Sequence, residues 1–158
     1  MIKMLAMDVD GTMTDGSIII SSDGTEIKSF SVKDGYGIVK ARKSGVIPVI
    51  ITGRESEIVS QRAAELGINE VHQGVQDKKY TLAEVASKYG ISHSEIAYIG
   101  DDVNDLDAMS IAGMTFAPAD AVDEIKNAVK IRLSNCGGHG AVRECIEYLF
   151  KSKLIEGE

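Results

Sequence analysis

Short apolar runs alternate along the chain with longer segments in which apolar residues recur every three or four positions. The runs are residues 2–9, 46–51, 96–99 and 114–117, and their uninterrupted apolar character is typical of parallel strands buried on both faces. The segments between them have the period of helices that cover a sheet. Because neighbouring parallel strands need crossover connections, the alternation predicts an α/β fold with a doubly wound, mostly parallel sheet.

Two of the intervening segments combine an apolar helix face with a stop signal. Residues 55–66 are followed by Gly67, and residues 77–89 are followed by Gly90. Glycine commonly ends a helix, so both helices are predicted to stop there. A last helix is expected at about residues 140–151. The side chains predicted to face the core are Ile58, Val59, Ala63, Leu66, Leu82, Val85, Ala86 and Tyr89.

Residues 17–32 break this alternation. They contain two β-prone runs around Ser22-Asp23-Gly24, and an Asp-Gly pair favours the positive φ angles of a tight hairpin turn. We therefore expect a β-hairpin that projects from a Rossmann-like sheet. At 158 residues the chain has the length of a single domain, residues 1–158, with one core.

Net charge and hydropathy exclude several kinds of partner. The formal net charge of −7 leaves no broad basic surface for nucleic acid or anionic lipid, and no apolar run has the length of a membrane span. Because only seven residues precede Asp8, we expect no secretory signal. Cys136 and Cys145 lack the spacing of a zinc site and are expected to be free thiols. These features together predict a cytoplasmic protein.

Two carboxylates, Asp8 and Asp10, stand where the first apolar run ends. Side chains alternate along an extended chain, so residues two apart can point into one site. In doubly wound sheets, ligands bind beyond the carboxyl ends of the strands, which is where these residues are expected. A solvated turn with helix-capping aspartates is the alternative explanation of this short motif taken alone.

Three further segments carry polar residues towards the same edge of the predicted sheet. Thr52 follows the second apolar run, Lys78 begins a helix, and an acidic segment, 101–105, follows the run at 96–99. Together they supply a nucleophilic carboxylate, a second carboxylate, a hydroxyl, an ammonium and an acidic cradle for a cation. This is the inventory for phosphoryl transfer through an aspartyl-phosphate intermediate. Oxygen ligands alone favour Mg²⁺, which with Lys78 would offset the repulsion between a phosphate and the carboxylates.

These four motifs resemble, in order and spacing, those of the haloacid dehalogenase superfamily of phosphohydrolases. The resemblance implies that Asp8 attacks phosphorus, and that Asp10 protonates the leaving oxygen and then activates water. It implies that Thr52 and Lys78 hold the phosphoryl oxygens. The Mg²⁺ ligands that it implies are Asp8, Asp101 and the backbone carbonyl of Asp10.

The distances between motifs leave no room for a cap domain. Forty-one residues separate Asp10 from Thr52, 25 separate Thr52 from Lys78, and 22 separate Lys78 from Asp101. The predicted hairpin, helices and strands already account for the residues in these segments. A site without a cap needs another wall to exclude water, so we expect a homo-oligomer in which the hairpin and the C-terminal segment cover a neighbouring site.

Two longer segments narrow the resemblance to one family. EIKSFSVKDGYGI at 26–38 and GGHGAVRE at 137–144 are similar to segments of the 3-deoxy-D-manno-octulosonate 8-phosphate phosphatases. This resemblance implies a capless tetramer that acts on a phosphorylated keto-deoxy sugar acid in lipopolysaccharide precursor synthesis. The chain departs from the family pattern at Thr12, Lys33 and His139. A nine-carbon keto-deoxy acid 9-phosphate therefore stays open as an alternative substrate.

Several charged residues near the motifs have two possible roles. Gly53 and Arg54 are candidates for substrate binding, with a surface ion pair as the alternative for Arg54. Arg143, in the first turn of the last helix, is a candidate for substrate binding or for a salt bridge between subunits. Asp105 is expected to orient the site through Lys78 rather than to bind the metal.

Three other classes of protein could carry part of this pattern. A phospho-receiver domain also uses an aspartyl phosphate, Mg²⁺, a Thr and a Lys, but its acidic pair normally lies on the first strand, away from the phosphorylated residue. A catalytically silent tetramerising module would not need the complete set of reactive side chains. A phosphotransferase would pass the phosphoryl group to an alcohol instead of water.

Overall fold

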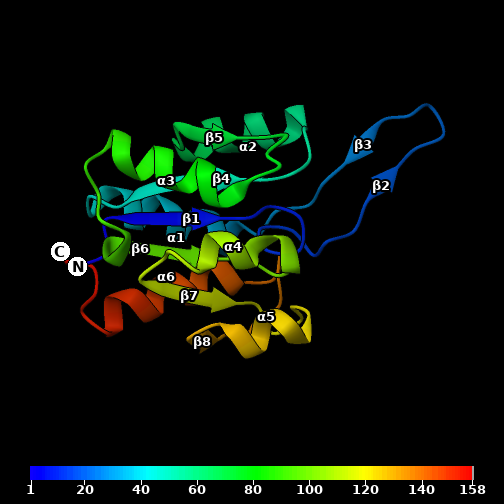
Figure 1. The fold of residues 1–158 in the computed structure, drawn as a ribbon. Coiled ribbons are helices and arrows are strands. Elements are labelled where there is room, and N and C mark those ends of the chain that lie inside the picture. Colours follow the sequence, from blue (N-terminus) through cyan, green and yellow to red (C-terminus); the bar gives the residue numbers. More distant parts are fainter. Residues whose placement is uncertain (158) are drawn as a thin grey trace.

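The structure, a computed structural model, describes residues 1–157 and is built on a parallel sheet of six strands in the order β5-β4-β1-β6-β7-β8 (Figure 1). The strands are β1 (Met4–Met7), β4 (Ile47–Ile51), β5 (Glu70–His72), β6 (Ile96–Ile99), β7 (Met114–Ala117) and β8 (Ile131–Arg132). The four predicted apolar runs are therefore confirmed as β1, β4, β6 and β7. The two-residue β8 was not predicted, because so short a segment carries no readable period.

Helices cover both faces of this sheet, as the alternation predicts. The helices are α1 (Val32–Lys43), α2 (Glu57–Leu66), α3 (Lys78–Lys88), α4 (Leu106–Met109), α5 (Asp123–Ala128) and α6 (Ala141–Lys151), with 3₁₀ turns at His93–Glu95 and Val103–Asp105. Residues of α1, α2 and α6 belong to one hydrophobic cluster, and residues of α3, α4 and α5 belong to the other. The doubly wound fold is confirmed.

The central strand β1 shows how the sheet separates the two clusters. Leu5 and Met7 pack into the α1, α2 and α6 side, whereas Met4 and Ala6 pack into the opposite side. All four side chains are fully buried. Alternate side chains of a strand point to opposite faces, so a strand covered on both sides must be apolar throughout.

The predicted helix stops are present, but two of the predicted core residues lie outside the core. Ile58 is only partly buried, and Tyr89 is exposed. Gly67 caps α2 in the left-handed conformation (φ 68°), and Gly90 has φ 63° just beyond α3. Tyr89 was predicted to face the core, yet it is 40% exposed and its hydroxyl donates a hydrogen bond to Glu70 Oε1 at 2.6 Å. As the residue that caps α3, Tyr89 has left the apolar face of the helix.

The hairpin consists of β2 (Ile19–Ile20) and β3 (Glu26–Ile27) and projects beyond the carboxyl edge of the sheet (Figure 1). Its loop has three residues, since the Ser21 N–H donates to the Thr25 carbonyl at 2.9 Å. Only Gly24 of the Asp-Gly pair has a positive φ, 87°. A three-residue loop needs just one left-handed residue, which explains why Asp23 keeps an ordinary conformation.

Apart from the hairpin, residues 1–157 contain no inserted unit that could serve as a cap. The segment between the hairpin and β4 is occupied by α1, as the spacing predicts. Over the same residues, the helices lack the combination of length and apolar character that crossing a bilayer requires.

Candidate active site

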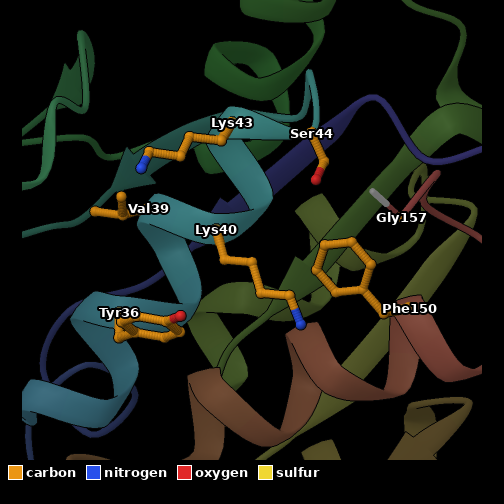
Figure 2. Close-up of a pocket in the computed structure, with 7 residues that line it drawn as sticks. All are labelled: Tyr36, Val39, Lys40, Lys43, Ser44, Phe150 and Gly157. Atoms are coloured by element: carbon orange, nitrogen blue, oxygen red, sulfur yellow. The ribbon is translucent and has the colours of Figure 1, made fainter.

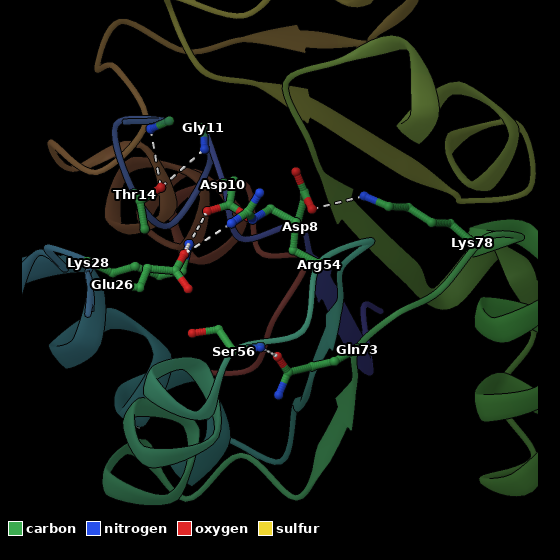
Figure 3. Close-up of polar contacts among 11 residues, drawn as sticks. Asp8, Asp10, Gly11, Thr14, Glu26, Lys28, Arg54, Ser56, Gln73 and Lys78 are labelled. Atoms are coloured by element: carbon green, nitrogen blue, oxygen red, sulfur yellow. Dashed lines mark hydrogen bonds and ion pairs between the residues drawn. The ribbon is translucent and has the colours of Figure 1, made fainter. Parts of the chain in front are cut away.

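Asp8, the residue directly after β1, forms a buried ion pair with Lys78, the first residue of α3. The distance from Lys78 Nζ to Asp8 Oδ1 is 2.9 Å, and both side chains are buried. Parallel strands end at one edge of the sheet, and α3 begins at the same edge, so residues 70 positions apart meet there. The predicted convergence of these two motifs is present (Figure 3).

Asp105 holds the same ammonium from the other side. Its Oδ1 accepts hydrogen bonds from Lys78 Nζ and from the Tyr98 hydroxyl, both at 2.8 Å. Its Oδ2 accepts from the backbone N–H groups of Asp101 (3.1 Å) and Asp102 (3.3 Å). Asp105 is fully buried, and both of its oxygens are occupied by donors. The expected contact between Asp105 and Lys78 is therefore present.

Three carboxylates, those of Asp8, Asp101 and Asp105, lie close enough to surround a cation. Each offers an oxygen within 4.8 Å of the oxygens of the other two. Because Asp105 already serves four donors, Asp8 and Asp101 have the greater capacity to bind an ion. Thr12 donates a hydrogen bond to Asp101 Oδ1 at 3.0 Å, which leaves Oδ2 free of that contact. An all-oxygen set of this kind fits Mg²⁺.

Gly11 makes room for the Asp101 carboxylate. Its φ is 90°, and a Cβ atom built on it would collide with the Asp101 carboxylate. Thr14 stabilises this loop, because its Oγ1 accepts hydrogen bonds from the backbone N–H groups of Gly11 and Gly16, each at 3.2 Å. The loop after β1 therefore needs a glycine for both its conformation and its approach to Asp101.

Burial and mutual repulsion raise the pKa values of the clustered acids Asp8 and Asp101. Burial, followed by the charge of Asp105, raises the pKa of Asp8. Burial, followed by the charge of Asp8, raises the pKa of Asp101 to about 8. Burial alone would lower the pKa of Lys78, but the charges of Asp8 and Asp105 raise it overall, so the ammonium stays charged. A divalent cation would relieve the repulsion between the carboxylates.

Asp10 is one of four charged side chains that form a ring, and its own side chain is 20% exposed. Its Oδ1 is 2.6 Å from Lys28 Nζ, and its Oδ2 is 3.9 Å from Arg54 Nε. Glu26 Oε1 faces both cations, at 3.1 Å from Lys28 Nζ and 3.3 Å from Arg54 Nη2. Figure 3 shows that the hairpin supplies two members of this ring. Lys28 and Glu26 were not predicted as site residues.

Thr52 and the turn after it occupy the next strand end. Thr52 is buried, and its backbone N–H donates to the His72 carbonyl at 2.9 Å. Gln73 supports the turn, since its Oε1 accepts a hydrogen bond from the Ser56 N–H at 2.7 Å. Gly53, in contrast, is exposed, as a residue that binds a ligand through its backbone would be.

The side-chain contacts of Arg143 lie outside the cluster of Asp8, Asp101 and Asp105. Its Nε lies 2.9 Å from Glu147 Oε1, and its guanidinium lies 5.0 Å from the centre of the Tyr36 ring. The Arg143 backbone N–H donates to Asp34 Oδ1 at 2.8 Å. The side-chain contacts of Arg143 are thus with α1 and α6, and a role in substrate binding stays a prediction.

A separate cavity of about 410 Å³ lies between α1 and α6, away from the acidic cluster (Figure 2). Lys40 crosses it, with its ammonium 4.3 Å from the centre of the Phe150 ring. No carboxylate lines it among residues 1–157, so it offers no site for a cation. Its lining residues are Tyr36, Val39, Lys40, Lys43, Ser44, Phe150 and Gly157.

The chain is similar in sequence to known phosphatases. Residues 68–143 match the family model of the haloacid dehalogenase-like hydrolases. The 3-deoxy-D-manno-octulosonate 8-phosphate phosphatase KdsC of Escherichia coli K12 is 38% identical over 159 residues, which cover 99% of this chain and 85% of that protein. The corresponding phosphatase of Haemophilus influenzae is 38% identical over 96% of this chain and 84% of its own length.

Solved structures of such phosphatases have the same fold. The Moraxella catarrhalis phosphatase, crystallised with magnesium, phosphate and KDO, superposes with a TM-score of 0.93 at 44% identity, covering 96% of this chain and 87% of that one. The cobalt-bound H. influenzae phosphatase superposes with a TM-score of 0.93 at 38% identity, covering 96% of this chain and 89% of that one.

Proposed function

The chain belongs to the haloacid dehalogenase-like hydrolases, in the family of the 3-deoxy-D-manno-octulosonate 8-phosphate phosphatases, and from this premise we propose that it hydrolyses 3-deoxy-D-manno-octulosonate 8-phosphate. The observation that carries the proposal is the buried Lys78, held between Asp8 and Asp105 beside Asp101. A phosphate monoester needs a nucleophile, a cation-binding cradle and a fixed positive charge, and this cluster offers all three.

In the proposed reaction, Asp8 is the nucleophile. A bond forms between its carboxylate oxygen and phosphorus while the bond from phosphorus to the leaving oxygen breaks, and Asp10 gives its proton to that oxygen. Asp10 then takes a proton from the water that hydrolyses the aspartyl phosphate. Thr52 and Lys78 bind the phosphoryl oxygens, and the proximity of Lys78 to Asp8, 2.9 Å, supports this role.

Mg²⁺ is the expected cofactor. Asp8, Asp101 and the backbone carbonyl of Asp10 would hold it. Burial, followed by the charge of Asp8, raises the pKa of Asp101 to about 8, and this crowding of carboxylates supports a cation at this place. When bound, the ion would neutralise carboxylate and phosphate charge.

Gly53, Arg54 and Arg143 complete the proposed substrate contacts. Arg54 is half exposed and stands beside Asp10, so its guanidinium can reach a ligand there. Arg143 is assigned on the family resemblance alone.

We also propose a homo-oligomer, a tetramer, in which the hairpin and the C-terminal segment cover a neighbour's site. The hairpin supports this, because it carries four isoleucines that are 44–62% exposed: Ile18, Ile19, Ile20 and Ile27. Light scattering measures the mass, and Ile20→Lys is expected to dissociate the assembly. A cytoplasmic location is part of the proposal, supported by the free thiols of Cys136 and Cys145.

A substrate panel tests the function. 3-Deoxy-D-manno-octulosonate 8-phosphate, nine-carbon keto-deoxy acid 9-phosphates and hexose phosphates are each assayed with Mg²⁺ and with EDTA. The largest kcat/KM is expected for the eight-carbon substrate with Mg²⁺. A larger value for a nine-carbon substrate reassigns the substrate, whereas no phosphate release from any compound contradicts the enzyme assignment. An added alcohol as acceptor separates hydrolysis from phosphoryl transfer.

A further inference from the structure

The two cations that face Asp10 are held very differently. The Lys28 side chain is 1% exposed and makes a short contact, 2.6 Å, with Asp10 Oδ1. The Arg54 side chain is 50% exposed and lies 3.9 Å from Asp10 Oδ2. Lys28 therefore fixes the orientation of the Asp10 carboxyl group, whereas Arg54 has the exposure to turn towards a ligand.

The burial of Lys28 is unusual for a residue on a projecting hairpin. A lysine there can leave its ammonium in water, yet this one reaches back over the sheet edge to the loop after β1. Burial alone would lower the pKa of Lys28, but the hydrogen bonds to Asp10 and Glu26 raise it overall. The ammonium thus stays charged, and its partners offset the loss of hydration.

We propose that Lys28 is a positioning residue for the proton transfer by Asp10, an inference that rests on the proposed function. Lys28 exchanges no proton itself. It holds Oδ1 of Asp10, so that the carboxyl group is aimed at the leaving oxygen when the bond between that oxygen and phosphorus breaks. The hairpin is then part of the catalytic apparatus of its own chain, in addition to any contact with a neighbour.

The test compares two leaving groups in Lys28→Met, which keeps the length of the side chain and removes its charge. A sugar phosphate leaves as an alkoxide that needs a proton, whereas p-nitrophenyl phosphate leaves as a stable phenolate that does not. The quantity compared is kcat/KM, because it covers only the steps up to the departure of the leaving group. Loss of positioning should therefore lower kcat/KM far more for the sugar phosphate than for p-nitrophenyl phosphate.

We expect kcat/KM to fall about 10- to 100-fold for 3-deoxy-D-manno-octulosonate 8-phosphate and less than about threefold for p-nitrophenyl phosphate. Lys28→Arg should restore most of the loss, because a guanidinium can donate to the same oxygen. Lys43→Met removes an exposed lysine at the end of α1 and should change neither value. Equal losses for the two substrates, or no loss for the sugar phosphate, would overturn the proposal.

Two further variants keep the test decisive. Glu26→Gln weakens the contact with Lys28 and leaves the ammonium paired with Asp10. It should therefore lower kcat/KM for the sugar phosphate more than for p-nitrophenyl phosphate, but by less than Lys28→Met does. This variant serves as the test if Lys28→Met fails to fold. Asp10→Asn distinguishes a failure of the proposed acid role of Asp10 from a failure of the positioning role of Lys28. If Asp10→Asn lowers kcat/KM equally for the two substrates, the acid role in the proposed function is wrong. If Asp10→Asn lowers kcat/KM mainly for the sugar phosphate and Lys28→Met does not, only the role of Lys28 is wrong.

Discussion

The Lys78 ammonium lies 2.8 Å from Asp105 Oδ1, in a part of the molecule where both side chains are almost completely buried. Asp105 also accepts hydrogen bonds from Tyr98 and from two backbone N–H groups. This aspartate fixes the position of the ammonium and of the loop that carries Asp101. It therefore links Lys78, which is proposed to bind the phosphate, to Asp101, which is proposed to bind the metal.

Asp105→Ala is expected to lower both stability and activity. Removal of one partner from a buried ion pair costs about 3–5 kcal/mol, and here the Lys78 ammonium and three further donors lose this acceptor. Urea denaturation in EDTA measures the free energy of unfolding, and kcat/KM should fall at least about tenfold because Lys78 is no longer held. Asp107→Ala, at an exposed position of α4, is the matched control and should stay within about 0.5 kcal/mol. Equal stability of the two variants would contradict the structural role of Asp105.

Gly11→Ala should damage the metal cradle specifically. A methyl group at this position collides with the Asp101 carboxylate, and it also strains a backbone with φ 90°. Gly45 has nearly the same φ, 86°, with open space around it, so Gly45→Ala reproduces the strain without the collision. Isothermal titration with Mg²⁺ should show binding that is at least about tenfold weaker in Gly11→Ala than in Gly45→Ala. Similar affinities in the two variants would mean that the position of Asp101 does not limit metal binding.

The sequence predicts the centre of this fold better than its margins. Strands β1, β4, β6 and β7 are covered on both faces, so their residues must be apolar in succession and stand out in the sequence. Strand β8 and helices α4 and α5 are too short to show a period. Tyr89 fits the helical period but leaves the core because the helix ends before it.

The candidate site was predictable wherever its residues come just after a strand of the sheet or begin a helix that covers it. Asp8, Thr52, Lys78 and Asp101 occupy such positions, and the parallel arrangement brings them to one edge. Lys28 and Glu26 were missed because they come from a hairpin whose direction is not encoded in any local period. A buried lysine in an otherwise exposed hairpin is recognised only once the path of the chain is known.

The apo protein should lose stability as the pH rises from 6 to 8. The pKa values of Asp8 and Asp101 are raised in the folded state, so in this range the folded protein binds more protons than the unfolded chain, and the free energy of unfolding falls with increasing pH. This contribution is fully present below the ordinary pKa of 3.8 and is lost as the pH passes through the folded-state pKa of Asp101, about 8. Thermal unfolding in EDTA at several pH values measures it.

Asp101→Asn should reduce this pH dependence, whereas Asp107→Asn should leave it unchanged. In the unmodified protein, Mg²⁺ should bind more tightly at pH 8 than at pH 6 and should release protons, because the carboxylates must ionise to bind the ion. Titration calorimetry in buffers of different ionisation enthalpy counts these protons. A stability in EDTA that rises from pH 6 to 8 would refute the predicted shifts.

Asp8→Asn should abolish phosphate release without weakening the fold. An amide cannot attack phosphorus, so turnover is expected to fall about 10⁴-fold or more. The substitution also removes a buried carboxylate whose pKa is raised by burial and by Asp105, so stability in EDTA near neutral pH should be equal to or higher than that of the unmodified protein. Acid quenching of the unmodified enzyme during turnover of a ³²P-labelled substrate should trap label on the protein, and the same quench of Asp8→Asn should trap none. Asp107→Asn is the control for both measurements. Label retained by Asp8→Asn would place the nucleophile elsewhere, whereas a large loss of stability would show that the carboxylate is needed to hold Lys78 in the folded protein.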